Sequence, residues 1–563
     1  MFVADAPPAA VTPVVEPEFA TCNGETISRI DVYRYAPAAR GLRAGERQAT
    51  DPSARGRRLD NADTDVIRAY LRIREDAPCL EQNRADSERL IRRLPFVASA
   101  AITPVADGNG RVRIRVDVVN EFPLVVGGGL RGLKLDEIRL GTLDFQERGT
   151  TLIGSLQRGD AYRDGIGAHY GQPGFLGGPR DLTVSGAFAP LGGHARLTLV
   201  QPLLAEAQAN AFLLQLSTAE RYDNVYRNTA ETAAARVQRS AYQFGVLQRI
   251  GRPGRGLIGI AGLAMLGSYT EADRNLVFVT DSGLQPVTDT TLDAHYGVFQ
   301  SHHVAALVGL RALRFRRAGR FDALRAEQDI AQGAELTLVF GPGIGPDRDD
   351  LIASGLYLGA GTPRSFVSLQ ANFEGRIRQA LGDGTWRFGV GHVHLTWFRL
   401  RSERRTSTLT LQGSVLEGHP LPSQLTMRDV EGGLLGYGES QRAGGQRIVA
   451  RAEDRWLVTG SAARFDLAVG TFADVGQLWA RDVPFGVDSP LMSSVGVSLY
   501  GAYPSGGRRV YRVDLGVPLS RGPGDRALVL RFSTFDRIIG RSREPRDVRT
   551  TRFETGPATA IRW

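Results

Sequence analysis

The feature that most constrains the fold is a long run of alternating segments, which begins near Pro123 and continues towards the C-terminus. Segments of roughly eight to twelve residues, separated by Gly, Asp, Pro and Asn, place apolar residues at every second position. We count roughly 16 to 19 such segments. An open sheet of this many strands would leave edges and would curl or split, whereas a closed barrel has no edge. The run therefore predicts a mostly β protein built on a large antiparallel barrel.

One stretch inside this run, Glu431 to Trp479, combines a Gly-rich loop with two alternating strands. Each strand has one apolar face and one polar, small or charged face, as in Arg447, Arg451 and Arg455 against Ile448, Ala450 and Trp456. Locally this pattern fits a soluble sandwich and also a membrane barrel whose polar face lines the lumen. The number of strands and the aromatic residues near strand ends favour the barrel. The strands assigned after the loop are 446–458, 463–478, 494–502, 508–518 and 526–535.

Two short motifs in this stretch carry a family resemblance: Leu434-Leu435-Gly436-Tyr437 in the loop and Phe472-Ala473-Asp474-Val475-Gly476 in the second strand. By order, spacing and strand context they resemble the BamA/TamA and two-partner-secretion family of outer-membrane assembly and secretion factors, the bacterial surface antigen family. The resemblance implies a transmembrane barrel of about 16 strands over residues 123–563. It also implies that a lid loop, here about 416–445, contacts the wall strand that carries Phe472, Asp474 and Gly476.

The lid arginine of that family falls on Leu435 here, so another cation is expected to neutralise Asp474. If residues 459–462 form the hairpin turn, antiparallel pairing places Arg455 opposite Asp466 and Arg447 opposite Asp474. We therefore expect Arg447, with Arg442 as the second choice, to be the partner of Asp474. The glycines of the loop permit close backbone approach, so we expect the loop inside the barrel.

The N-terminal part of the chain has a different pattern. Residues 1–21 are rich in Pro and Ala and are predicted to be a linker. Residues 22–122 follow the order strand, helix, helix, strand, strand, with a helix from Thr64, a second over 85–94 and a turn at 107–110. This order resembles a POTRA domain, the periplasmic α+β module attached to barrels of this family. Cys22 and Cys79 both lie in or beside it, and an oxidising compartment would permit a disulfide between them.

Composition excludes several classes of protein. The net charge of +9 is scattered along alternating strands rather than gathered in a patch, so we expect no nucleic-acid partner. The sequence contains no apolar run long enough for a spanning helix, and no signal peptide is visible at the N-terminus. The abundance of glycine, 67 residues, against 4 methionines suits a protein of strands and turns.

Candidates for catalysis or cofactor binding have simpler explanations. Gly127 to Gly132 match GxGxxG, but the next segment reads as a strand, so we expect these glycines to thin the first barrel strand. His392 and His394 share a strand face without a third metal ligand, while His302 and His303 point to opposite faces. Asp349 and Asp350 are expected in a solvated turn. We therefore expect no enzymatic activity and no cofactor.

Two further expectations concern the tail and the function. The strand at 526–535 is expected to close the barrel, with an Arg-rich tail after Phe535; the alternative makes 551–563 the terminal strand. The resemblance implies a bacterial outer-membrane protein that inserts or translocates polypeptides. Its partners would be unfolded outer-membrane or secreted clients, the bilayer with its outer-leaflet lipid, and accessory periplasmic subunits. Alternatives are a passive channel or structural barrel and a soluble all-β binding protein.

Overall fold

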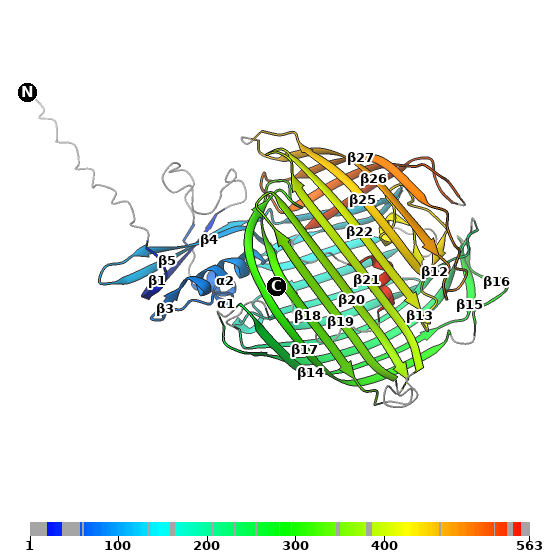
Figure 1. Ribbon diagram of the computed structural model, residues 1–563, viewed down its shortest axis with the longest axis horizontal. Helices are drawn as coiled ribbons and strands as arrows, with labels where there is room; N and C mark the ends of the chain where they lie inside the picture. Colours follow the sequence, from blue (N-terminus) through cyan, green and yellow to red (C-terminus); the bar gives the residue numbers. More distant parts are fainter. Residues whose placement is uncertain are drawn as a thin grey trace, which may run out of the picture.

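The alternating segments pair side by side in chain order from Leu124 to Asp536 and close into one antiparallel barrel (Figure 1). This is seen in a computed structural model that describes residues 20–35, 57–58, 61–131, 134–157, 164–203, 208–229, 231–253, 256–280, 282–293, 296–344, 349–378, 385–460, 463–522, 524–536 and 544–552. Residues 1–19 of the predicted linker lie outside this described part. The mostly β, barrel-forming character predicted from the sequence is confirmed.

The described wall contains about 20 strands. Of the 22 strands in the ring order, β15 (Asn275–Thr280) and β16 (Gly283–Thr291) form an added hairpin, because β14 pairs directly with β17. The wall strands are β6 Leu124–Arg131, β7 Lys134–Phe145, β8 Thr150–Gln157, β9 Gly165–Gln172, β10 Asp181–Ala189, β11 Gly192–Gln201, β12 Asn210–Tyr226, β13 Thr232–Ile250, β14 Ile258–Ala272, β17 Val298–Gly319, β18 Glu327–Gly341, β19 Asp349–Gly361, β20 Ser365–Arg378, β21 Thr385–Leu400, β22 Arg405–Glu417, β25 Gln446–Leu457, β26 Asp466–Trp479, β27 Met492–Ala502, β28 Arg509–Pro518 and β29 Val529–Asp536.

The prediction of about 16 strands is therefore wrong. That number came from the family resemblance, and the count of roughly 16 to 19 alternating segments is also below the observed number. Strand number is fixed by ring closure, in which tilt, stagger and diameter are linked, and this is a property of the whole sheet. β29 neighbours β6 in the closed ring, so the strand expected at 526–535 does close the barrel.

The wall reverses the usual distribution of side chains. Along β18, Glu335 and Thr337 are buried, whereas the alternating Leu336, Leu338 and Phe340 are 40%, 47% and 44% exposed. β27 repeats the pattern, with buried serines alternating with exposed Val and Leu. In a soluble protein such aliphatic rows would face a core, so an outer surface of this kind requires an apolar solvent. This rules out the soluble sandwich.

A smaller α+β unit lies at one end of the barrel, which we call the near mouth; the opposite end is the far mouth (Figure 1). Its sheet has the order β2-β1-β5-β4, with β3 paired to β1. Both full helices begin a few residues before their predicted starts. The elements are β1 Asn23–Tyr35, β2 Arg57–Arg58, α1 Asn61–Ala69, β3 Pro78–Leu80, α2 Glu81–Arg92, β4 Val97–Ala106 and β5 Arg111–Asn120.

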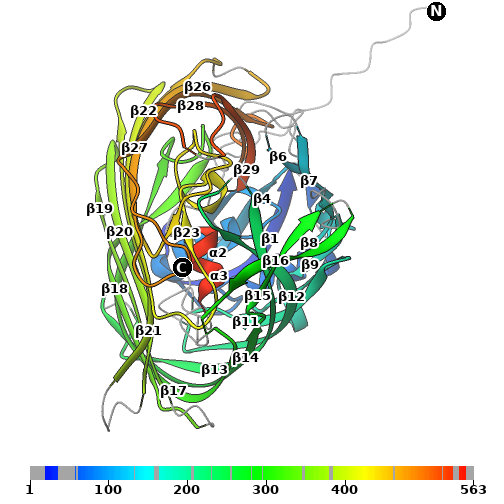
Figure 2. The same ribbon diagram turned by 90° about the vertical axis from the view of Figure 1, so that its right-hand side faces the viewer.

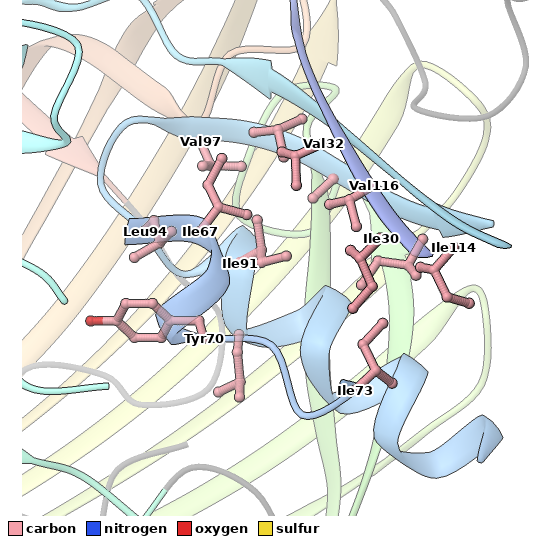
Figure 3. Close-up of a cluster of buried hydrophobic side chains, with 14 of the residues drawn as sticks. Ile30, Val32, Ile67, Tyr70, Ile73, Ile91, Leu94, Val97, Ile114 and Val116 are labelled. Atoms are coloured by element: carbon pink, nitrogen blue, oxygen red, sulfur yellow. The ribbon is translucent and has the colours of Figure 1, made fainter. Parts of the chain in front are cut away.

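The core of this unit forms because the inner faces of the strands are apolar at every second residue and α2 turns Leu90 and Ile91 towards them. Figure 3 shows Ile30 and Val32 of β1 and Ile114 and Val116 of β5 packed with Ile91 and the rest of this cluster. A disulfide joins Cys22 to Cys79, so the start of β1 is tied covalently to β3.

The α+β unit contacts the near mouth at several turns around the ring. It reaches the β7–β8 turn through Arg34, the β17–β18 region through Arg92 and the β27–β28 turn through Glu121. The contacts are an ion pair of Arg34 with Asp144, one of Arg92 with Asp329 at 2.6 Å, and a hydrogen bond from the amide of Arg508 to Glu121 at 3.1 Å. Because these turns belong to separate parts of the ring, the unit bridges the near mouth.

Candidate functional site: the lid and the lumen wall

The loop between β22 and β25 folds back into the barrel lumen (Figure 2). Its main chain makes a small ladder of β23 (Leu425–Thr426) with β24 (Ala443–Gly444) and one turn of 3-10 helix, η2 (Asp429–Glu431). Leu434, Leu435 and Tyr437 are fully buried. We call residues 418–445 the lid; the predicted lid began two residues earlier, inside β22.

The lid main chain is held directly by the wall. The amide of Leu435 donates to Oδ2 of Asp474 at 2.8 Å, and the amide of Gly436 donates to Oγ of Ser494 at 3.1 Å. The Tyr437 hydroxyl donates to the Ser520 carbonyl at 2.6 Å. A Cβ on Gly436 would lie 2.6 Å from Cβ of Ser494, so this close approach requires glycine.

The wall motif supplies three alternating positions on the inner face of β26. Phe472 covers Gly496, where a Cβ would meet its ring at 2.4 Å. Asp474 receives the lid amide, and Gly476 leaves space for the lid, since a Cβ there would lie 3.1 Å from Cε of Met427. One aromatic, one acid and one glycine at this spacing therefore make a socket for the lid.

The guanidinium that neutralises Asp474 belongs to Arg451. It donates to Oδ2 of Asp474 from Nη2 at 3.1 Å and to the Gly433 carbonyl at 2.9 Å, while Ser494 donates to Oδ1. The pairing register places Arg451 opposite Asp474, because the hairpin turn is longer than expected and β26 begins only at Asp466. The prediction that Arg447 or Arg442 pairs with Asp474 is therefore wrong.

Arg447 and Arg442 have other positions in the lumen. Arg447 lies opposite Leu478 and makes two hydrogen bonds to Asp547, at 2.6 and 3.1 Å. Asp547 belongs to α3 (Arg546–Thr551), which sequence patterns did not single out. Arg442 lies beside Gly522, in the far-mouth loop between β28 and β29. The sequence could have indicated Arg451 as a partner of Asp474, because Arg451 lies on the same strand face as Arg447. Nothing in the sequence indicates that Asp547 is the partner of Arg447.

Arginines of the wall bind peptide carbonyls of three chain segments. Arg451 donates to a lid carbonyl, as above. Arg455 donates to the carbonyls of Phe321 and Asp322 at 2.8 and 3.0 Å, in the β17–β18 turn that folds inward at the near mouth. Arg239 of β13 donates to the Thr550 carbonyl at 3.2 Å. The polar inner surface therefore binds main chain independently of side-chain identity.

Burial shifts the pKa of groups in the lid and in α3. It lowers the pKa of His419 to about 3, so this imidazole is neutral and bonds to the carbonyl of Thr551 at 3.0 Å. Burial raises the pKa of Glu431 and also that of Asp547, in the latter case against the opposing effect of Arg447.

The other candidates from the sequence have structural roles. His392 bonds to Ser414 at 2.9 Å and His394 to Thr396 at 2.6 Å; across the described residues no cluster of three or more His, Cys, Asp or Glu could hold a metal ion. Asp349 is buried at the start of β19, 3.5 Å from Arg376, so the solvated turn expected there is wrong. Gly127 and Gly129 of the GxGxxG match lie in β6, which is followed by β7 rather than a helix, and Gly132 lies outside the described residues.

The sheet edge of the α+β unit is covered by α2. The amide of Ile102 on β4 donates to Oε2 of Glu88 at 3.1 Å, and Arg84 donates to the Ile102 carbonyl at 2.8 Å. Arg92 donates to the Ala100 carbonyl at 3.2 Å. These backbone groups of the β4 edge, which an added strand would otherwise bind, already have side-chain partners.

A closed antiparallel barrel with an apolar exterior, a polar lumen and a loop folded into that lumen defines an integral β-barrel membrane protein. Among the residues that the structure describes, no helix is long and apolar enough to cross a bilayer. No protein-family model matches the chain, and no curated protein matches it.

Solved structures do match. BamA from Haemophilus ducreyi lacking POTRA domains 1–3 is 11% identical, with 91% of this chain and 85% of that chain covered and a TM-score of 0.40. CdiB from Escherichia coli is 11% identical, with 92% of each chain covered and a TM-score of 0.41. CdiB from Acinetobacter baumannii is 10% identical, with 91% and 74% covered and a TM-score of 0.43. Likenesses of this size assign no function.

Proposed function

We propose that this chain is a bacterial outer-membrane protein that inserts unfolded polypeptides into the membrane or translocates them across it. The observation that carries the proposal is the lumen itself, where wall arginines hold three chain segments largely through main-chain carbonyls. A surface that binds backbone accepts many sequences, as an assembly or secretion factor must. The sequence motifs of the lid and wall support the same function.

The lid is the movable part of this mechanism. Its described contacts with the wall here are the hydrogen bonds of Leu435 with Asp474, of Gly436 with Ser494 and of Gly433 with Arg451, together with packing of Leu434 and Met427. A client that donates its own amides to Asp474 and Ser494 would replace the first two of these bonds one for one. No nucleotide, cofactor or catalytic chemistry is part of the proposal.

The α+β unit acts in this proposal as a POTRA-type domain in the periplasm, at the near mouth. Its β4 edge is available to a client only when Arg84, Glu88 and Arg92 move away. Glu88 also pairs with Arg317, and Arg92 with Asp329, both on the barrel. Client binding at this edge would therefore loosen the unit from the mouth. Accessory periplasmic subunits and outer-leaflet lipid complete the expected set of partners.

The test is reconstitution. The full chain in liposomes of bacterial outer-membrane lipid is given a urea-unfolded outer-membrane β-barrel protein, and the folded fraction is followed by heat-modifiable mobility on a gel. We expect faster folding than in empty liposomes, and a changed rate with Asp474→Asn but not with Asp454→Asn, whose carboxylate pairs with the exposed Arg405. Folding no faster than in empty liposomes, together with a large steady conductance in planar bilayers, would establish a passive channel instead.

A further inference from the structure

The chain returns into the lumen after its last wall strand. Residues 544–552, which include α3, lie inside the ring (Figure 2, red). On the lid side, Asp547 is bound by Arg447 and also accepts the Thr426 amide at 3.2 Å. Val548 is fully buried in the cluster that contains Met427 and Leu434 of the lid.

The same segment also reaches other parts of the wall. Arg239 of β13 donates to the carbonyls of Thr550 and Arg552. The Arg552 guanidinium donates to the carbonyls of Asn372 on β20 and Val390 on β21, at 3.2 and 3.4 Å. Contacts to β13, β20, β21 and β25 mean that the segment crosses the lumen instead of lying along one strand.

The lid fits around this segment. Gly432 has a φ of +99°, a conformation that favours glycine, and a Cβ there would lie 2.5 Å from Cβ of Pro545. The η2 turn therefore has its present shape only with glycine beside the tail. Lid and tail are packed as one body in the middle of the barrel.

We propose that residues 544–552 are an internal plug that occupies a peptide-binding site of the lumen, and that the ligand of this site is a polypeptide segment carrying a carboxylate. The site consists of Arg447 for the carboxylate, Arg239 and His419 for main-chain carbonyls, and the pocket of Val548 for a small aliphatic side chain. This inference rests on the proposed function for the identity of the natural ligand, a client polypeptide.

Charge explains why the ligand carries an acid. Arg447 is only 2% exposed with residues 544–552 in place, so a segment seated in this site buries the guanidinium and leaves it without a counter-charge unless it brings a carboxylate. The plug is therefore displaced most readily by an incoming segment that supplies a carboxylate to Arg447. An acidic client would exchange with the plug, whereas a neutral client would bury the Arg447 guanidinium without a counter-charge.

The experiment measures conductance in planar bilayers, which needs no client. The full chain is compared with a chain truncated after Asp536, and folding of both is checked by heat-modifiable mobility. We expect the truncated barrel to conduct more, and a synthetic peptide of residues 544–552 to restore the block. The same peptide with Asp547→Asn is expected to require about a 30-fold higher concentration for the same block of conductance. The Thr550→Ala peptide, whose altered hydroxyl bonds only within α3, is the matched control and should block like the parent.

A folded truncated barrel with the conductance of the full chain overturns the plug, and so does equal block by the parent and Asp547→Asn peptides. If the truncated chain does not assemble, the test uses the full-length Asp547→Asn, Val548→Asp double variant. We expect this variant to open more often than the parent chain. An unchanged conductance would overturn the proposal. The liposome folding assay can fail while the conductance experiments give the results expected of a plug. That outcome would exclude the polypeptide-insertion function but would retain the peptide-binding site.

Discussion

The ion pair of Arg451 with Asp474 holds the wall carboxylate that accepts the Leu435 amide of the lid, and its removal gives the sharpest prediction. Asp474 is 3% exposed and accepts hydrogen bonds from Arg451, the Leu435 amide and Ser494. In Asp474→Asn, an amide nitrogen replaces one of the two carboxylate oxygens and cannot accept a hydrogen bond, and Arg451 loses its counter-charge. The Arg451 side chain is 18% exposed, so water screens part of the loss. We expect the free energy of unfolding to fall by about 2–4 kcal/mol, below the ~3–5 kcal/mol of a fully buried pair.

The assay is equilibrium urea unfolding of the detergent-refolded protein, followed by tryptophan fluorescence. Wild type is compared with Arg451→Gln, Asp474→Asn and the double variant, and the cycle should give a coupling of about 1–2 kcal/mol. The control cycle pairs Arg451→Gln with Asp454→Asn, three residues further along β25 and on its other face, and should be additive. Additive behaviour of Arg451 and Asp474, or strong coupling of Asp474 to Arg442 instead, would refute the assignment of the ion pair.

The other predictions concern the lid and the α+β unit. Burial lowers the pKa of His419 to about 3, below the ordinary value near 6.5. The stability that this shift contributes is therefore fully present above pH 6.5 and is lost from there down to pH 3, by about 1.4 kcal/mol per pH unit. Urea unfolding of His419→Gln at several pH values should lack this loss of stability at low pH. Gly476→Val should push Met427 and Leu434 away and lower stability by about 1–3 kcal/mol, seen as faster protease cleavage of the lid; Gly413→Ala, in open space on β22, should leave cleavage unchanged. Glu88→Gln removes the partner of Arg317 on β17 and should weaken docking of the α+β unit by about 2–5 kcal/mol, measured as loss of a chemical cross-link to the β17–β18 region. Glu81→Gln, which loses only its pair with Arg84 inside the unit, should keep the cross-link.

The sequence by itself determined the class of the fold and the faces of its strands. Alternation over so many segments excludes an open sheet, and it assigned Arg447, Arg451 and Asp474 to inward faces, as observed. It also marked the lid through its glycines, of which Gly436 and Gly432 are required by close approach to Ser494 and Pro545. These features are local, because the two-residue period and the freedom of glycine do not depend on distant parts of the chain.

Only the tertiary structure decided which inward residues meet. The expected and observed registers of the β25–β26 hairpin differ by four residues, and a shift by an even number leaves every side chain on its face, so the pattern cannot detect it. In the same way, closure of the ring set the number of strands, and Arg447 met Asp547 only because the tail folds back across 100 residues of sequence. Partners of buried charges are chosen by the folded ring as a whole, which is why the sequence placed Asp474 in the lumen but assigned it the wrong arginine.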